Sequence, residues 1–84
     1  MPLKVSVISP ERTIFDGSVD SVVAPAFDGE VGILPGHAAM MTLLGKGSLR
    51  LGPDGSAGRF QVEGGFLQVV DDSVRVVTER ATPG

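Results

Sequence analysis

The 84-residue sequence contains no cysteine, tryptophan or tyrosine, and His37 is its only histidine. Without cysteine the chain can form neither disulfides nor thiolate metal sites, which fits a reducing compartment without proving one. A zinc site needs roughly three or four ligands, and only Asp28 and Glu30 lie near His37 in the sequence. No serine is spaced to be activated by a histidine and a carboxylate. We therefore expect no catalytic residue, no metal and no cofactor.

The sequence also lacks an excess of basic charge and any long hydrophobic run. Ten acidic residues against seven basic ones give a net charge of −3, which argues against nucleic acid as the main partner. No apolar segment approaches the roughly 20 residues of a membrane-spanning helix. The first residues, Met-Pro-Leu-Lys-Val-Ser, lack the apolar core of a signal peptide. We expect no direct insertion into a membrane, although a partner could hold the chain beside one.

What is present is a small chain rich in valine, leucine and isoleucine, which favour strands. Its length suits a single domain, residues 1–84, that buries roughly 60–65% of its unfolded surface. Apolar and polar residues alternate at 3–7, 49–51 and 60–63, and no segment sustains a helical period. Eight or more short strands separated by close turns predict an all-β fold, which would be a flattened antiparallel sandwich or barrel.

Several boundaries follow from local signals. Asp16-Gly17 predicts a hairpin turn, and Pro25 is expected to end the strand that precedes it. Residues 38–44 are predicted to be a strand, although their composition also suits a helix. Gly64-Gly65 predicts a kink or a tight turn, and residues 82–84 are expected to be a frayed end.

Residues 28–38, with the sequence Asp-Gly-Glu-Val-Gly-Ile-Leu-Pro-Gly-His-Ala, organise the chain. Glycine permits backbone angles that a Cβ forbids, and Pro35 fixes its own φ and favours an extended Leu34. The segment predicts a turn, a short buried strand and a second turn, with Glu30 and His37 near the turns. We interpret it as a shaped loop that presents side chains to another protein surface.

Two other classes of protein have a small β fold of this kind. A biotin- or lipoyl-type carrier domain would carry its modified lysine at a hairpin tip, and Lys46 between two glycines is the candidate. The usual neighbours of such a lysine are missing. An oligonucleotide-binding barrel would need basic residues and stacking aromatics, whereas this chain is acidic and its only aromatic residues other than His37 are phenylalanines.

Five segments of the chain carry specific sequence patterns. The most specific is Gly-Glu-Val-Gly-Ile-Leu-Pro-Gly-His-Ala at residues 29–38, and the others lie at residues 3–11, 15–22, 62–69 and 74–81. In this order they resemble the patterns of the epsilon subunit of F-type ATP synthases, and residues 29–38 are similar to the signature loop of that family. The resemblance implies a flattened sandwich of about ten strands in two sheets, in agreement with the strand pattern.

The resemblance also implies a function without catalysis. Epsilon is a subunit of the rotating central stalk that binds gamma and the ring of c subunits and helps to couple ion flow to ATP synthesis. By this resemblance the chain would be peripheral, at the cytoplasmic face of the bacterial plasma membrane. The implied c-ring contact comprises Pro25, Ala26, Phe27, Asp28, Gly29, Glu30, Val31 and Gly32, with Glu30 near a basic residue of the ring. The implied gamma contact comprises His37, Ala38, Met40, Met41 and Thr42.

One departure from the family concerns the C-terminal side. Family members usually continue as two helices of roughly 40–50 residues, a size that fits a helical hairpin. Those helices carry inhibition of ATP hydrolysis in the family. The sequence here stops at Gly84, so we expect a sandwich without the helical domain and without that inhibition.

Overall fold

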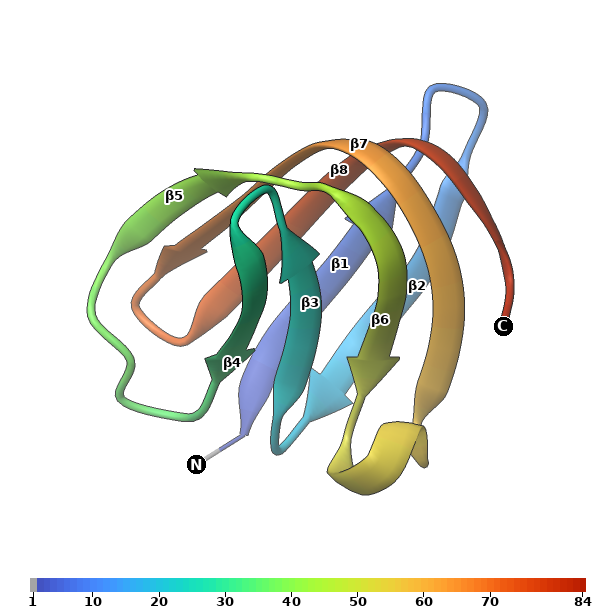
Figure 1. Ribbon diagram of the computed structural model, residues 1–84. Helices are drawn as coiled ribbons and strands as arrows, with labels where there is room; N and C mark the ends of the chain where they lie inside the picture. Colours follow the sequence, from blue (N-terminus) through green and yellow to red (C-terminus); the bar gives the residue numbers. More distant parts are fainter. Residues whose placement is uncertain (1) are drawn as a thin grey trace.

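A computed structural model describes residues 2–84 as eight strands and one short 3₁₀ turn (Figure 1). The strands alternate buried apolar and exposed polar side chains, as β1 does with Leu3, Val5 and Val7 inside. The elements are β1 (Leu3–Ile8), β2 (Thr13–Val19), β3 (Val22–Ala26), β4 (Gly29–Ile33), β5 (Met40–Leu43), β6 (Lys46–Leu51), η1 (Pro53–Gly55), β7 (Gly58–Val70) and β8 (Ser73–Pro83). This confirms the all-β prediction.

Two long strands, β7 and β8, bend together and divide the structure into two five-stranded layers. The first sheet runs β2-β1-β8-β7-β5 and uses the β8 and β7 segments nearest their shared turn. The second sheet runs β8-β7-β6-β3-β4 and uses the other ends of the same two strands. In Figure 1, β7 arches over from one layer to the other. Counted by segments, the sandwich therefore has ten strands, as the family resemblance implied.

The bend is centred on Gly64 and Gly65, where the sequence predicted a kink or a tight turn; the strand continues through it, so it is a kink. Both have positive φ, 70° and 101°, and a Cβ at Gly65 would overlap the carbonyl oxygen of Val77. Thr78, only 1% exposed, lies opposite in β8, and its Oγ1 is 2.9 Å from the Arg80 carbonyl oxygen and 3.3 Å from that of Glu63. The hydroxyl has one proton to donate, and the Arg80 carbonyl is the nearer of its two acceptors, so it gives this corner a hydrogen bond between side chain and backbone.

The core lies between the two sheets and is entirely aliphatic. Its fully buried side chains come from both layers, and Leu67 and Val69 of the first sheet are matched by Leu49 and Leu51 of the second. The four phenylalanines lie outside this set of fully buried residues. Because the core uses one face of each strand, the other face of each sheet is exposed and available to partners.

Three sequence-based boundaries were wrong. Asp16 and Gly17 lie inside β2, because both pair with β1, and the chain turns at residues 20–21 instead. Pro25 lies inside β3 and is buried. The pairing of β3 with β6 covers Val22 and Val23 only, so the missing N–H of Pro25 costs no hydrogen bond to β6. The Pro25 carbonyl accepts from Gly45 N–H at 2.8 Å. The predicted frayed end is paired, since Gly84 N–H donates to the Arg59 carbonyl at 3.0 Å.

The pairing is antiparallel throughout the described residues 2–84 except between β1 and β8, which run parallel from Lys4 opposite Ser73 to Ile8 opposite Val77. This single parallel pair places the first and last strands side by side in the middle of the first sheet. The pair forms only when the last strand, β8, returns to lie beside the first strand, β1.

Candidate functional site

The expected c-ring residues form a β-hairpin rather than an open loop. Pro25 pairs with Glu30 and Ala26 with Gly29, which leaves Phe27 and Asp28 as the two-residue turn. β4 is an edge strand of the second sheet, and of its residues only Ile33 is fully buried. The predicted short buried strand is therefore a largely exposed edge, anchored by Ile33 and in part by Val31.

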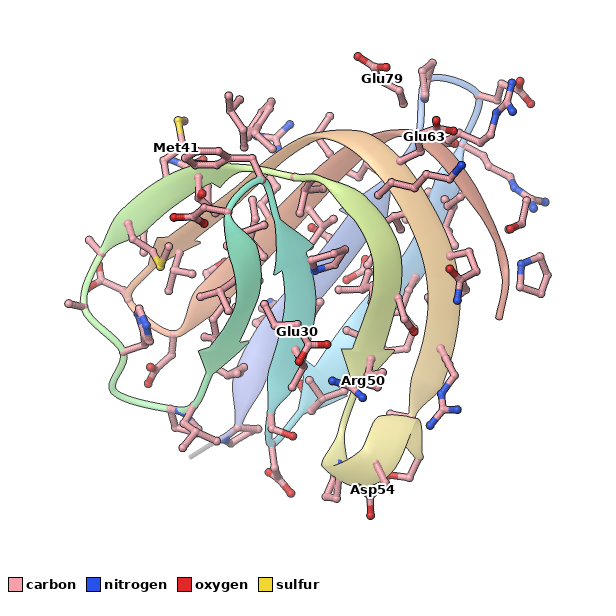
Figure 2. All side chains as sticks on the ribbon, viewed as in Figure 1. Glu30, Met41, Arg50, Asp54, Glu63 and Glu79 are labelled. Carbon is pink, nitrogen blue, oxygen red and sulfur yellow. The ribbon has the colours of Figure 1, made fainter. Side chains whose placement is uncertain are left out.

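Glu30 is engaged within the chain. Its Oε2 lies 2.9 Å from Nη2 of Arg50 on β6, and the two side chains are 62% and 34% exposed (Figure 2). The ion pair reaches across β3, which lies between β4 and β6 in the sheet. An exposed pair of this kind contributes about 0–1 kcal/mol, so it orients the carboxylate more than it stabilises the fold.

Arg50 also lies directly opposite Arg59 of β7. Like charges at opposed positions disfavour strand pairing unless each finds another partner. Arg50 has the Glu30 carboxylate, and Arg59 Nη2 donates to the Asp54 carbonyl of the η1 turn at 2.9 Å. The Glu30 carboxylate therefore offsets the charge of Arg50 beside Arg59, a pairing between distant residues that sequence spacing did not indicate.

The hairpin tip meets the corner between β5 and β6. Phe27 N–H donates to the Leu43 carbonyl at 3.0 Å, and Ala26 forms an isolated bridge with Leu44. Phe27 is 67% exposed and Leu43 62% exposed, so two large apolar side chains lie on the surface at one place. The expected c-ring residues therefore adjoin the end of β5, the strand that carries the expected gamma residues Met40, Met41 and Thr42.

An apolar row crosses the outer face of the first sheet from this corner. Leu43 is opposite Phe66, Phe66 is opposite Val77, and Val77 is opposite Ile8. Each alternates with a buried neighbour and so points away from the core. Met41, 64% exposed, lies on the same face of β5 (Figure 2). We call Phe27, Met41, Leu43, Phe66, Val77 and Ile8 the apolar face.

The expected gamma residues separate by orientation. Met41 belongs to the apolar face, whereas Met40 packs against the core and Thr42 lies opposite buried Leu67. His37 and Ala38 lie in the connection before β5. His37 Nδ1 is 2.7 Å from the Ala38 carbonyl oxygen, which can only accept, so Nδ1 carries the proton and donates. Of the five, Met41 presents the largest exposed apolar surface.

The sequence analysis missed four members of the apolar face: Ile8, Leu43, Phe66 and Val77. The available signal was an apolar residue at a position that strand alternation assigns to the solvent side. Phe66 next to buried Leu67 is one case, and Val77 next to buried Val76 is another. Their alignment into one row depends on strand register, which the alternation does not reveal.

A third surface lies on the outer side of the second sheet near the bend. Lys46, Glu63 and Arg80 occupy opposed positions on three adjacent strands and line a shallow groove of about 270 Å³. Lys46 begins β6 instead of standing at a hairpin tip, which removes the feature that suggested a carrier domain. Within residues 2–84, no three histidine, aspartate or glutamate side chains converge on a point that could hold a metal ion.

No helix formed by residues 2–84 is long and apolar enough to span a membrane. Three features stand out on the surface of residues 2–84: the apolar face, the Glu30–Arg50 pair, and the groove lined by Lys46, Glu63 and Arg80.

Comparison with known proteins identifies relatives over the whole described chain. The family described as ATP synthase, Delta/Epsilon chain, beta-sandwich domain matches residues 2–84. An ATP synthase epsilon chain of Rhodopirellula baltica is 47% identical over 83 residues, covering 99% of this chain and 65% of the relative. One from a Synechococcus strain is 42% identical over 84 residues, covering 100% of this chain and 61% of the relative. The chain thus spans less than two thirds of these relatives.

Solved structures agree with the fold. A chain in the Euglena gracilis mitochondrial ATP synthase assembly of OSCP, F1 and c-ring superposes with a TM-score of 0.86 at 25% identity, covering 98% of this chain and 53% of that one. A chain from the central stalk and c-ring of the Tetrahymena thermophila enzyme has a TM-score of 0.79 at 16% identity, which supports the fold alone. Together with the match over residues 2–84, these relatives show that the chain belongs to the family of ATP synthase delta/epsilon chain β-sandwich domains.

Proposed function

We propose that this chain acts as a non-catalytic central-stalk subunit of an F-type ATP synthase that connects gamma to the c-ring. In this role it helps to couple ion flow to ATP synthesis. Membership of the delta/epsilon chain family over residues 2–84 is the observation that carries the proposal. The proposed location is the cytoplasmic face of a bacterial plasma membrane, as a peripheral part of the complex.

The apolar face is the proposed docking surface for gamma. It exposes Phe27, Met41 and Leu43 at 67%, 64% and 62%, and such a cluster on a small protein marks an interaction site. Phe27, which the resemblance implied for the c-ring contact, is thus assigned to the gamma surface. It includes Met41 of the expected gamma residues and adjoins the connection that carries His37 and Ala38. Burial of these side chains against a stalk subunit would remove apolar surface from water, the main favourable term in association.

The proposed c-ring contact is the side of the β3–β4 hairpin that bears Glu30. The carboxylate is 62% exposed and held by Arg50, so a basic group on the ring would share it with Arg50 or displace that residue. Electrostatic pairs of this kind determine orientation and register more than affinity. A rotor that transmits torque needs a fixed orientation, which suits this chemistry.

Binding to purified gamma tests the docking surface. Met41→Glu and Leu43→Glu should each weaken binding by roughly tenfold or more, because they place a charge in a desolvated contact. Val70→Glu is the matched control, since Val70 is 44% exposed on the same outer face but lies outside the apolar face. Unchanged binding of both variants, or an equal loss in the control, would contradict the assignment.

A further inference from the structure

The turn between β7 and β8 joins three parts of the molecule through Asp72. Asp71 and Asp72 form its two central positions, with φ of 49° and 61°. The Asp72 carbonyl accepts from Lys4 N–H of β1 at 2.8 Å. Its carboxylate accepts from Gly36 N–H at 2.7 Å, across 36 positions of sequence. Asp71, its neighbour, is exposed and has no side-chain hydrogen bond within residues 2–84.

Gly36 belongs to the connection of residues 34–39, which crosses from β4 in the second sheet to β5 in the first. Figure 1 shows this connection passing beside the β7–β8 turn. It pairs with no strand, and Leu34 is 62% exposed. His37 N–H donates to the Leu34 carbonyl at 3.1 Å within the connection. Among the described residues, the bond to Asp72 is the one hydrogen bond that ties the connection to a distant segment.

From this geometry we propose that Asp72 is a positioning residue for the connection between the sheets. Its carboxylate holds Gly36 and so determines the course of the chain through His37 and Ala38 to the start of β5. A carboxylate that accepts from a backbone N–H makes a short, charge-assisted bond, and 2.7 Å is the length expected of one. The functional consequence rests on the proposed function, because this segment adjoins the apolar face proposed to bind gamma.

The two aspartates of the turn provide a matched test. Both have positive φ, so glycine is tolerated at either position, and each substitution removes one negative charge. Only Asp72→Gly removes the acceptor for Gly36. Asp72→Asn keeps a side-chain carbonyl oxygen at the same place, and asparagine also tolerates this backbone conformation.

The first measurement is amide hydrogen exchange at Gly36 in the 84-residue chain, followed by NMR. Asp72→Gly should accelerate exchange at Gly36 by roughly tenfold, the effect of losing about one hydrogen bond, whereas Asp71→Gly should leave the rate near that of wild type. Asp72→Asn should restore most of the protection. Equal rates in the two glycine variants would overturn the proposal, because the carboxylate would then not hold the connection.

The second measurement is affinity for purified gamma. Asp72→Gly should weaken binding by roughly threefold to tenfold, with Asp71→Gly and Asp72→Asn near wild type. If wild type binds gamma and Asp72→Gly binds equally well despite faster exchange, the positioning role is refuted. If wild type does not bind gamma, the proposed function fails, and the exchange rates alone decide whether Asp72 holds the connection.

Discussion

The corner that β7 makes at Gly64 and Gly65 and the region from β3 to β5 are both rich in glycine, but glycine has a different role in each. At the corner, Gly65 has a φ of 101° and approaches β8 so closely that a Cβ would lie 2.8 Å from the Thr78 Cα. In the other region, Gly32 and Gly36 have nothing within 4 Å of a Cβ position. Glycine at the corner is required by close packing. Gly36 is favoured instead by its φ of 87°, and Gly32 has neither constraint.

This difference separates folding from recognition. The corner lets β7 and β8 contribute to both sheets, and the core lies between those sheets, so the packing of the core depends on the corner. β4 and the connection after it contribute Ile33 and, in part, Val31 to the core and otherwise present exposed or half-exposed side chains, whereas β3 is anchored by Val22 and Ala24. Substitutions at the corner should therefore change the free energy of unfolding, and substitutions in the other region should change binding and coupling.

Gly65→Ala should have the largest effect on stability. A Cβ would overlap the Val77 carbonyl at a positive φ, so the corner must move, and we expect a loss of about 4 kcal/mol or more, or failure to fold. Chemical denaturation followed by circular dichroism measures it. Gly32→Ala is the control and should change the free energy of unfolding by no more than about 0.5 kcal/mol. Equal effects in the two variants would refute the distinction between the regions.

Thr78→Val should have an intermediate effect. It keeps the shape of a side chain that is 1% exposed but removes the hydroxyl at the corner, which takes a hydrogen-bond donor from the part-buried carbonyls of Arg80 and Glu63. We expect a loss of about 1–3 kcal/mol in the free energy of unfolding. Thr82→Val, at an exposed position of the same strand, should change it by less than about 0.5 kcal/mol. A neutral Thr78→Val would mean that the corner needs only the glycines.

Glu30→Gln should have the smallest effect on stability and a distinct effect on function. Because the Glu30–Arg50 pair is exposed, its loss should cost about 0–1 kcal/mol. In the assembled enzyme we expect weaker coupling between proton flow and ATP synthesis while gamma still binds, measured as ATP synthesis and proton pumping in membranes. A compensating change on the c-ring loop, and none on gamma, should restore coupling.

The control for Glu30→Gln is Glu63→Gln, on the outer face of the same sheet but separated from the hairpin by β6 (Figure 2). It removes the same charge and should leave coupling intact. If Glu30→Gln membranes synthesise ATP and pump protons like wild type, then the carboxylate serves only its pair with Arg50, and contact with the ring must depend on the shape of the hairpin.

Local signals in the sequence were sufficient for the strands and for the corner. Alternation of apolar residues identified β1 and most of β7 and β8, because a strand with one buried face repeats every two residues. Gly64-Gly65 indicated a kink or a tight turn, because glycine adopts backbone angles that other residues avoid. The resemblance over residues 3–81 then led to the two-sheet sandwich and to the candidate contacts, which single-strand patterns could not have assigned.

Long-range pairing decided the rest. The parallel pairing of β1 with β8, the row from Leu43 to Ile8, and the partners of Glu30 and Asp72 all join segments far apart in sequence. Alternation specifies which face of a strand is buried, but not which strand lies beside it or in what register. Pro25 and Asp16-Gly17 were misread for the same reason, since their neighbours in other strands override local turn preferences.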